Sequence, residues 1–273
     1  MLQPRYAPDG LPFYASPLLE SRGVPHAFST RVGGVSPAPF DSLNLGISRD
    51  SQLKDARENI LENYRRLAAA IGCAGRERCW VSQVHGADVC AARAGGGFEN
   101  GICADAVVTD DPSRIVSVKY ADCVPILLAS ADGRAAAAIH AGWRGIVAGV
   151  LPAAVARLAA VAGGNAETLV AAVGPCIGLE HFEVGPEVLA AFVNLFGADA
   201  PLRRADSGKG HVDLREAVRR QLLAAGLPAA HVDVSDHCTF DRRADYFSHR
   251  RDGVATGRMA AVVGVRGGET RKE

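Results

Sequence analysis

Four short apolar runs follow one another in the middle of the chain with only brief turns between them. They read "DAVVTD", "RIVSVKY", "VPILLAS" and "AAAAIH" and occupy residues 105–110, 114–120, 124–130 and 135–140. Their length and the turn residues that bound them favour β-strands. A parallel connection needs a crossover of about a dozen residues or more, which these turns are too short to supply. Several of the strands must therefore pair antiparallel, and a strict alternation of strands and helices is excluded.

Helical periodicity appears on both sides of these runs. It predicts helices over residues 55–72, 145–163, 185–197 and 212–226, each closed by a glycine where a C-terminal cap is expected. Pro152 is expected to bend the second of them. Further strand-like runs occupy residues 79–85, 168–174, 231–236 and 258–265. We predict an α+β fold with a mixed, largely antiparallel β-sheet core flanked by helices. No linker or repeat divides the chain, so we expect a single domain over residues 1–273, with a flexible tail at 265–273.

The charge balance restricts the class of partner. Thirty basic and thirty acidic residues cancel, so the chain has no overall field that would attract nucleic acid or an anionic membrane. The segment "MLQPRYAPDG" has no apolar core of a signal peptide, and no long uncharged apolar window follows. We expect a cytoplasmic protein that is a monomer or a weak homo-oligomer and binds a small or neutral ligand.

The cysteines do not form a structural framework. There are seven, at positions 73, 79, 90, 103, 123, 176 and 238, without CxxC spacing. An odd, scattered set argues against disulfides and against a ribbon-type zinc site. A functional cysteine must therefore be identified by its surroundings.

Three residues with metal-binding side chains stand where predicted strands meet turns. They are His85 in "QVHG", Cys123 in "ADC" and His140 in "HAGWRG". Two imidazoles and one thiolate form a ligand set for a catalytic Zn²⁺ that keeps its fourth position open. Spacing alone does not show that the three converge, and a buried cysteine with two hydrogen-bonded turn histidines would fit the same pattern.

The order of motifs along the chain resembles the laccase-domain family, also called the polyphenol-oxidase-like or purine nucleoside phosphorylase family. The motifs are "FSTRVGGVSPAPFDSLNLG" (28–46), "QVHG" (83–86), "ADAVVT" (104–109), "ADCVPILL" (121–128), "IHAGWRG" (139–145), "GPCIG" (174–178), "FEV" (182–184) and "CTF…YFSHRRDGVATGRMAA" (238–261). Together they span nearly the whole chain, so the resemblance does not depend on any one of them.

The resemblance implies a metal site and an activity. The family's metal ligands match His85, Cys123 and His140, and the implied metal is Zn²⁺, with Cu²⁺ possible in its place. The family is associated with phosphorolysis of adenosine, inosine and 5′-methylthioadenosine, and with deamination of adenosine. The implied partners are therefore purine nucleosides and phosphate.

Phosphate would have to be held by cations, and an arginine fork suits it best. Arg31 in "TRVGG" and Arg144, just after His140, are our candidate catalytic arginines, and Arg250 and Arg258 are candidates for substrate binding. For each of them the alternative is a solvated surface charge or a partner of a helix end, and for Arg258 that alternative is as well supported as a function.

Two further polar residues are candidates by their position. Asp122 precedes Cys123, so it could orient a metal-bound histidine or act as a general acid or base; its structural alternative is a strand-end carboxylate that accepts backbone N–H groups. Asn44 in "SLNLG" could contact ligand hydroxyls, although asparagine before a glycine turn also has an ordinary local role.

Other functions remain open at this level. Cys123 activated by His140 would suit a thiol hydrolase or deamidase that needs no metal. A copper-loaded polyphenol oxidase is a further alternative, although the eight histidines contain no H-x-H pair for a multicopper array. A nucleoside sensor without turnover would use the same pocket.

Overall fold

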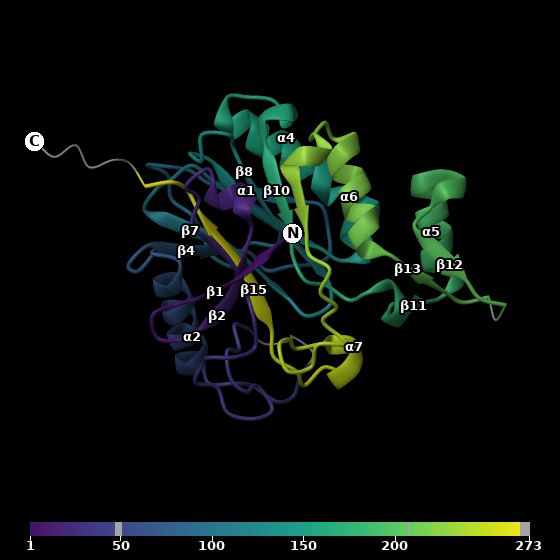
Figure 1. Cartoon of the computed structure of the whole chain (residues 1–273), viewed down its shortest axis with the longest axis horizontal. Coiled ribbons are helices and arrows are strands. Elements are labelled where there is room, and N and C mark those ends of the chain that lie inside the picture. The colour runs from purple at the N-terminus through teal and green to yellow at the C-terminus, as the bar shows by residue number, and fades with distance from the viewer. Residues whose placement is uncertain (47–50, 207, 268–273) are drawn as a thin grey trace, which may run out of the picture.

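The computed structural model describes residues 1–46, 51–206 and 208–267, and its centre is a pair of six-stranded sheets (Figure 1). The strand order of the first sheet is β1 (Gln3–Tyr6), β2 (Pro12–Ala15), β3 (His26–Ser29), β15 (Met259–Gly264), β7 (Arg114–Tyr120) and β4 (Glu77–Trp80). Neighbouring strands in this sheet pair antiparallel, except that β7 and β4 pair parallel.

The second sheet carries most of the strands expected from the central apolar runs. It pairs antiparallel in the middle and parallel at both edges. Its order is β14 (Val232–Val234), β10 (Val170–Val173), β8 (Val124–Ala129), β9 (Ala136–Ala141), β6 (Ala106–Thr109) and β5 (Val89–Ala92). The predicted mixed, largely antiparallel sheet core flanked by helices is therefore confirmed.

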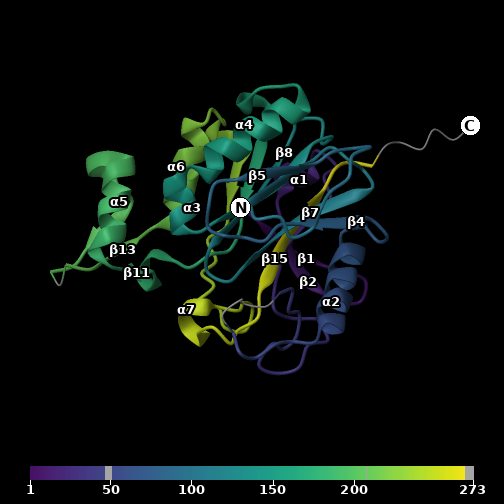
Figure 2. The same cartoon turned by 180° about the vertical axis from the view of Figure 1, so that it is seen from behind.

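The layers follow the order helix, sheet, sheet, helix, as Figure 2 shows from behind. The helix α2 (Arg57–Ala70) covers the first sheet, and α4 (Val150–Ala162) and α6 (Leu214–Ala224) cover the second. Side chains of β8 alternate accordingly: Ile126 and Leu128 pack toward the helices, whereas Leu127 packs toward the first sheet. Both faces of this sheet are buried, which explains why its strands read as continuous apolar runs.

The helix expected over 145–163 is two helices, so that prediction was wrong in its detail. The chain forms α3 (Trp143–Ala148), then turns at Gly149, which has a left-handed φ of 87°, and continues as α4. Pro152 lies in the first turn of α4, where its missing N–H costs no hydrogen bond. The break is therefore made by the glycine and not by the proline.

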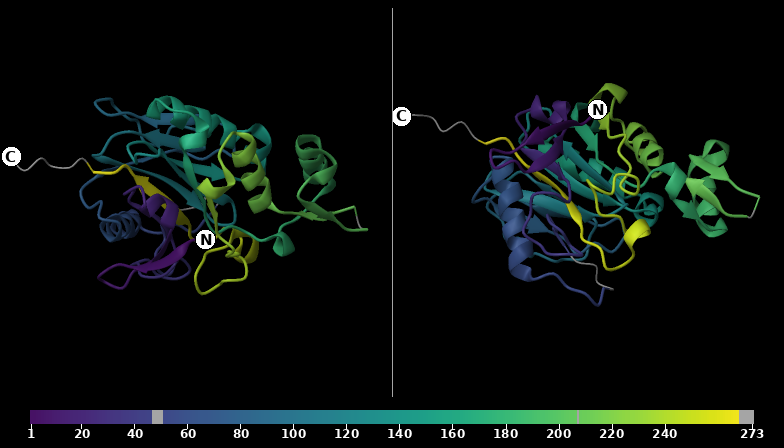
Figure 3. Two further views of the ribbon diagram at one scale, coloured as in Figure 1. Left: turned by 45° about the horizontal axis from the view of Figure 1, so that its top comes forward. Right: turned by 60° about the horizontal axis from the view of Figure 1, so that its bottom comes forward.

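Several elements were not expected from the sequence. A small sheet of β11 (Glu183–Val184), β13 (Gly210–Val212) and β12 (Leu202–Arg204) carries α5 (Pro186–Phe196) and projects to one side (Figure 3). The strands β1, β2, β3 and β5 and the short helices α1 (Pro17–Glu20) and α7 (His249–Asp252) are also additional. In the part of the chain that the structure describes, no helix is long and apolar enough to cross a membrane. Of the expected tail, residues 268–273 lie outside the described residues, and Val265 is buried.

Candidate metal centre

The fold brings together the three residues that the sequence singled out, and we call His85, Cys123 and His140 the metal triad. Cys123 directly precedes β8, and His140 lies near the end of β9, where it pairs with Pro125. His85 comes from the turn that follows β4. One ligand atom from each of the three lies within 4.8 Å of the other two. The convergence arises because an antiparallel hairpin returns the end of β9 to the start of β8.

The donor atoms have a spacing that suits a single cation. Sγ of Cys123 lies 3.8 Å from Nε2 of His85, and the two imidazole rings have centroids 4.9 Å apart at an interplanar angle of 77°. Ligands around a tetrahedral zinc ion lie roughly 3.3–3.7 Å from one another. His140 is buried, Cys123 is half-buried and His85 is exposed. The triad is thus closed on the core side and open toward solvent, as a catalytic metal site requires.

Asp105 orients the triad from behind, and sequence reasoning did not identify it. Its fully buried carboxylate accepts a 2.8 Å hydrogen bond from Nδ1 of His140, which leaves Nε2 for a metal. It also accepts the backbone N–H groups of residues 84–86, at 3.1, 3.0 and 2.7 Å, and so holds the turn that carries His85. Burial alone would raise the pKa of Asp105, but the bonds from His140 and from Gly86 outweigh it and lower the pKa.

The sequence did contain a weak signal for Asp105. The residue opens the motif that becomes β6, and β6 pairs with β9 so that the backbone N–H of His140 donates to the carbonyl of Asp105 at 2.8 Å. An acidic residue at the start of a buried apolar strand is unusual enough to be noticed. Its partner, however, depends on which strands pair, and that was not known from the sequence.

The electrostatics of the ion-free triad favour a thiolate next to an imidazolium. Burial opposes ionisation of Cys123, yet the neighbouring His140 and His85 lower the pKa of its thiol to about 6. Burial likewise opposes protonation of His140, but Cys123 and Asp105 raise the pKa of that imidazole to about 9. The thiolate that a metal requires is therefore already favoured at neutral pH.

Two backbone features, at His85 and at Gly142, allow the side chains of the triad to approach one another. His85 adopts a left-handed φ of 61°, which is uncommon outside glycine and is supported here by the bonds to Asp105. Gly142 follows β9 directly opposite these side chains. A Cβ atom at Gly142 would lie 2.7 Å from Cδ2 of His85 and 3.1 Å from Sγ of Cys123. Only glycine leaves the two ligands free to approach each other at this position.

Asp122 takes part in a different set of contacts from those of His140. Its buried carboxylate accepts a 2.6 Å hydrogen bond from Oγ1 of Thr239 and another of 2.6 Å from the backbone N–H of Arg250. Its own φ is 90°, again in the left-handed region. The orienting partner of His140 is thus Asp105, and Asp122 anchors the C-terminal segment beside Cys123. A catalytic role of Asp122 stays a prediction.

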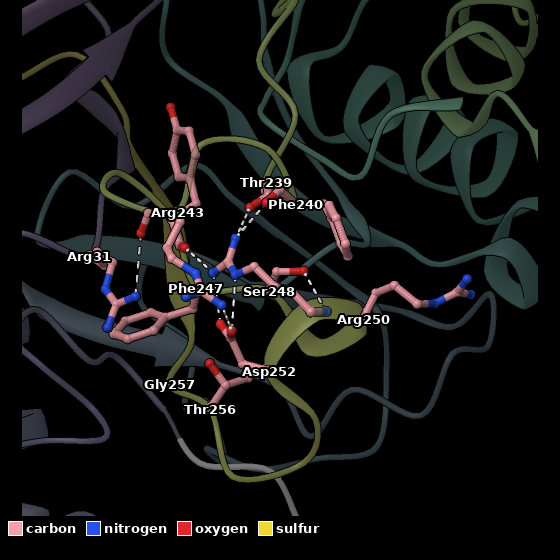
Figure 4. Close-up of polar contacts among 12 residues, drawn as sticks. Arg31, Thr239, Phe240, Arg243, Phe247, Ser248, Arg250, Asp252, Thr256 and Gly257 are labelled. Atoms are coloured by element: carbon pink, nitrogen blue, oxygen red, sulfur yellow. Dashed lines mark hydrogen bonds and ion pairs between the residues drawn. The ribbon is translucent and has the colours of Figure 1, made fainter. Parts of the chain in front are cut away.

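The two candidate catalytic arginines differ in exposure and in their hydrogen bonds. Arg144 is exposed and stacks on the ring of Trp143 at 4.3 Å, and its guanidinium makes no hydrogen bond to any residue that the structure describes. Arg31 lies over Phe247 at 4.4 Å and donates to the carbonyl of Arg243 at 3.4 Å (Figure 4). It also donates to the carbonyl of Asp41 at 2.9 Å. Burial lowers the pKa of Arg31. Arg144 is therefore free to take an anion, whereas Arg31 is already engaged.

The three candidates for substrate binding mostly bond to the protein itself. Asn44 is fully buried; its amide N–H donates to Asp55, and its amide oxygen accepts the backbone N–H groups of Gly46 and Arg258. The guanidinium of Arg258 donates to the carbonyls of residues 256 and 257, at 2.9 Å each. Arg250 is exposed, and its guanidinium donates to the carbonyls of residues 181 and 183, at 3.3 and 2.9 Å. Their roles toward a ligand remain predictions.

Comparison with known proteins identifies the family. A model described as multi-copper polyphenol oxidoreductase laccase matches residues 25–266. A purine nucleoside phosphorylase of Deinococcus radiodurans is 40% identical over 256 residues, covering 94% of each chain. Purine nucleoside phosphorylase YfiH of Escherichia coli is 37% identical, covering 89% of this chain and 95% of its own. The crystal structure of YlmD from Geobacillus stearothermophilus superposes with a TM-score of 0.82 at 32% identity, covering 93% of this chain and 96% of its own. The chain belongs to the laccase-domain family that its motifs resemble.

Proposed function

We propose that the chain is a metal-dependent purine nucleoside phosphorylase that acts on adenosine, inosine and 5′-methylthioadenosine and also deaminates adenosine. The observation that carries the proposal is the convergence of the metal triad on a site open to solvent. The names of the curated relatives support the reaction class. Each of these substrates is an uncharged nucleoside, which fits a chain without net charge.

The triad fits Zn²⁺ by donor type. It offers two imidazoles and a thiolate, with Asp105 behind one imidazole, and these are ligands and supports that zinc prefers. The same set accepts Cu²⁺, since affinity orders place copper above zinc. When bound there, zinc would act as a Lewis acid and lower the pKa of a coordinated water.

The chain's own residues would bind and orient the reactants. Arg144, four positions after His140, has a free guanidinium that would hold one face of the phosphate. The ring of Trp143 fixes that guanidinium by stacking, so less rotamer freedom is lost when phosphate binds. Asp105 keeps His140 in the tautomer with Nε2 directed into the site.

A second candidate function uses the same side chains without a metal. A thiol hydrolase needs a cysteine nucleophile, a histidine base and an acidic residue that orients the histidine, and these would be Cys123, His140 and Asp105. The lowered pKa of Cys123 favours the nucleophilic thiolate. What favours the metal is His85, whose Nε2 lies 3.8 Å from the thiol, because a thiol hydrolase needs no second imidazole there.

A substrate screen separates these functions. The purified protein is incubated with adenosine, inosine, 5′-methylthioadenosine or a phenol, each with and without phosphate, before and after removal of metal by a chelator. The proposal predicts free purine base together with ribose 1-phosphate, or with 5-methylthioribose 1-phosphate from 5′-methylthioadenosine. These products appear only with phosphate, vanish with the chelator and return with Zn²⁺. Cys103→Ser, at an exposed cysteine outside the triad, serves as the control and retains activity. Full turnover after metal removal would instead support the thiol enzyme, and oxidation of the phenol alone would support a copper oxidase.

A further inference from the structure

A second group of metal-binding side chains lies outside the metal triad. His181 ends the 3-10 helix η2 (Leu179–His181), and Cys238 and Asp241 lie in the turn after β14. One ligand atom from each lies within 4.8 Å of the other two. We call His181, Cys238 and Asp241 the second cluster. Its residues come from two segments far apart in the chain, so their proximity is a product of the fold.

The donors of the second cluster are held in place by their neighbours. The ring of Phe240 stacks on that of His181 with centroids 4.2 Å apart and an interplanar angle of 16°, which fixes the plane of the imidazole. Nε2 of His181 lies 2.6 Å from Oδ1 of Asp241. Nitrogen and oxygen ligands of a tetrahedral zinc ion are roughly 3.3 Å apart. Because the side chain of Asp241 is 56% exposed, it is free to make that small adjustment.

The sulfur of Cys238 has surroundings that suit a metal thiolate. Sγ accepts the backbone N–H of Gly178 at 3.2 Å. The backbone N–H groups of Phe240 and Asp241 also face this sulfur. Successive backbone N–H groups that surround a sulfur stabilise its negative charge, as in known metal–thiolate sites.

Asp241 is the acidic member of the second cluster, and its carboxylate lies within 4.8 Å of the other two donor atoms. Among the described residues, the only ion-pair partner of Asp241 is His181. A divalent cation between the thiolate, the carboxylate and the imidazole would replace this ion pair and bind all three donor atoms.

We propose that the second cluster binds its own divalent transition-metal ion, with Zn²⁺ as the best match to one thiolate, one imidazole and one carboxylate. The ion joins the turn at 238–241 to the segment at 178–181. Thr239, next to Cys238, donates to Asp122 at 2.6 Å, and Asp122 precedes Cys123 of the metal triad. The second ion is thus structural and holds the segment on which Asp122 is anchored.

Cobalt reports on the two sites separately, because each has a single cysteine ligand. The chelator-stripped full-length chain is titrated with Co²⁺ while the thiolate-to-Co²⁺ charge-transfer absorption is followed. We expect two ions per wild-type chain, and in Cys123→Ser and in Cys238→Ser one ion each with about half of the absorption, since one of two thiolate ligands remains. The double variant Cys123→Ser/Cys238→Ser is expected to lose the absorption. A folded Cys123→Ser variant without this absorption would overturn the proposal.

A surface substitution tests the same site without touching a cysteine. Asp241→Asn, made both in the wild type and in Cys123→Ser, is expected to weaken Co²⁺ binding at the second cluster at least ~10-fold with an unchanged circular dichroism spectrum. Asp236→Asn, at an aspartate that is 73% exposed and outside the cluster, is the matched control and leaves the titration unchanged. If Asp241→Asn binds two Co²⁺ ions as tightly as the wild type does, the second cluster is not a metal site.

Discussion

The metal triad and the second cluster use similar donors on different supports. Two ligands of the triad flank the β8–β9 hairpin, in a sheet buried on both faces. A fully buried carboxylate, Asp105, fixes both His140 and the turn of His85. The second cluster joins two surface turns, and its carboxylate is 56% exposed.

The contrast separates the site that the fold alone can form from the site that needs a metal. The sheet and Asp105 pre-form the triad, so the proposed ion there would be available for chemistry. The second cluster joins two segments at the surface, so its proposed ion would help to hold these segments together. A site that keeps its geometry without the ion suits catalysis, because preorganised ligands cost no rearrangement during the reaction.

The largest expected effect is on kcat/KM, and it differs between substitution of Cys123 and substitution of Cys238. Cys123→Ser is expected to lower kcat/KM for phosphorolysis of inosine about 10³-fold, since metal catalysis contributes several kcal/mol. Cys238→Ser, which removes a ligand of the proposed structural site, is expected to lower it less than about 10-fold. Steady-state kinetics with added Zn²⁺ checks this. Equal losses in the two variants would break the distinction between a catalytic and a structural ion.

The affinity of the triad for Zn²⁺ should depend on pH in a defined direction. Without the ion, His140 is protonated below a pKa of about 9 and Cys123 loses its proton above a pKa of about 6. Zinc requires both without protons, so one proton is released on binding between these values. The dissociation constant is expected to fall about 10-fold per pH unit between pH 6 and 9 and to level off above pH 9. Calorimetry on Cys238→Ser isolates this site, and a constant affinity across that range would contradict the thiolate–imidazolium pair.

The role of Asp105 is tested by Asp105→Asn. Loss of the carboxylate behind His140 is expected to weaken Zn²⁺ binding to the triad about 10- to 100-fold. Asp55, another buried aspartate, accepts hydrogen bonds from Ser36, Asn44 and Asn59 in a different part of the chain. Asp55→Asn is therefore the matched control, expected to lower thermal stability while zinc affinity is retained. Competition with a fluorescent chelator measures the zinc affinity of both variants. An Asp105→Asn variant with the zinc affinity of the wild type would show that the sheet alone positions His140.

The smallest expected effect is on the KM for phosphate and compares Arg144, beside the metal triad, with Arg250, beside the second cluster. Arg144→Ala is expected to raise KM for phosphate about 10-fold, the value of one charge-assisted hydrogen bond. Arg250 already donates to two carbonyls next to the second cluster, so Arg250→Ala is expected to change this KM less. Initial rates at varied phosphate concentration compare the two. A larger effect from Arg250→Ala would place the phosphate on the side of the second cluster.

The sequence predicted the parts of the fold that depend on local pattern. Continuous apolar runs became β6 to β10, and amphipathic periodicity became α2, α5 and α6. The helix at 145–163 was wrong in detail because the left-handed conformation of Gly149 interrupts it. The small sheet β11–β13 was missed because its strands are only two or three residues long, too short to show a period of two.

The candidate site was predictable where chemistry marked the residues. The thiol of Cys123 and the imidazole of His140 stood out because they interrupt apolar strands, and the motifs of the family pointed to the same positions. Asp105 and the second cluster were not found, because their partners are set by strand pairing and by turns distant in the chain. The engagement of Arg31 and Asn44 with the protein itself was likewise invisible without the fold.

The central claim is that the metal triad holds one ion on which phosphorolysis depends. The most direct measurement follows release of hypoxanthine from inosine by chelator-stripped protein in phosphate buffer while Zn²⁺ is added stepwise to wild type and to Cys123→Ser. We expect no release before zinc is added, full recovery in the wild type once zinc fills both proposed sites, and none in Cys123→Ser. Undiminished release by the stripped wild type would contradict it.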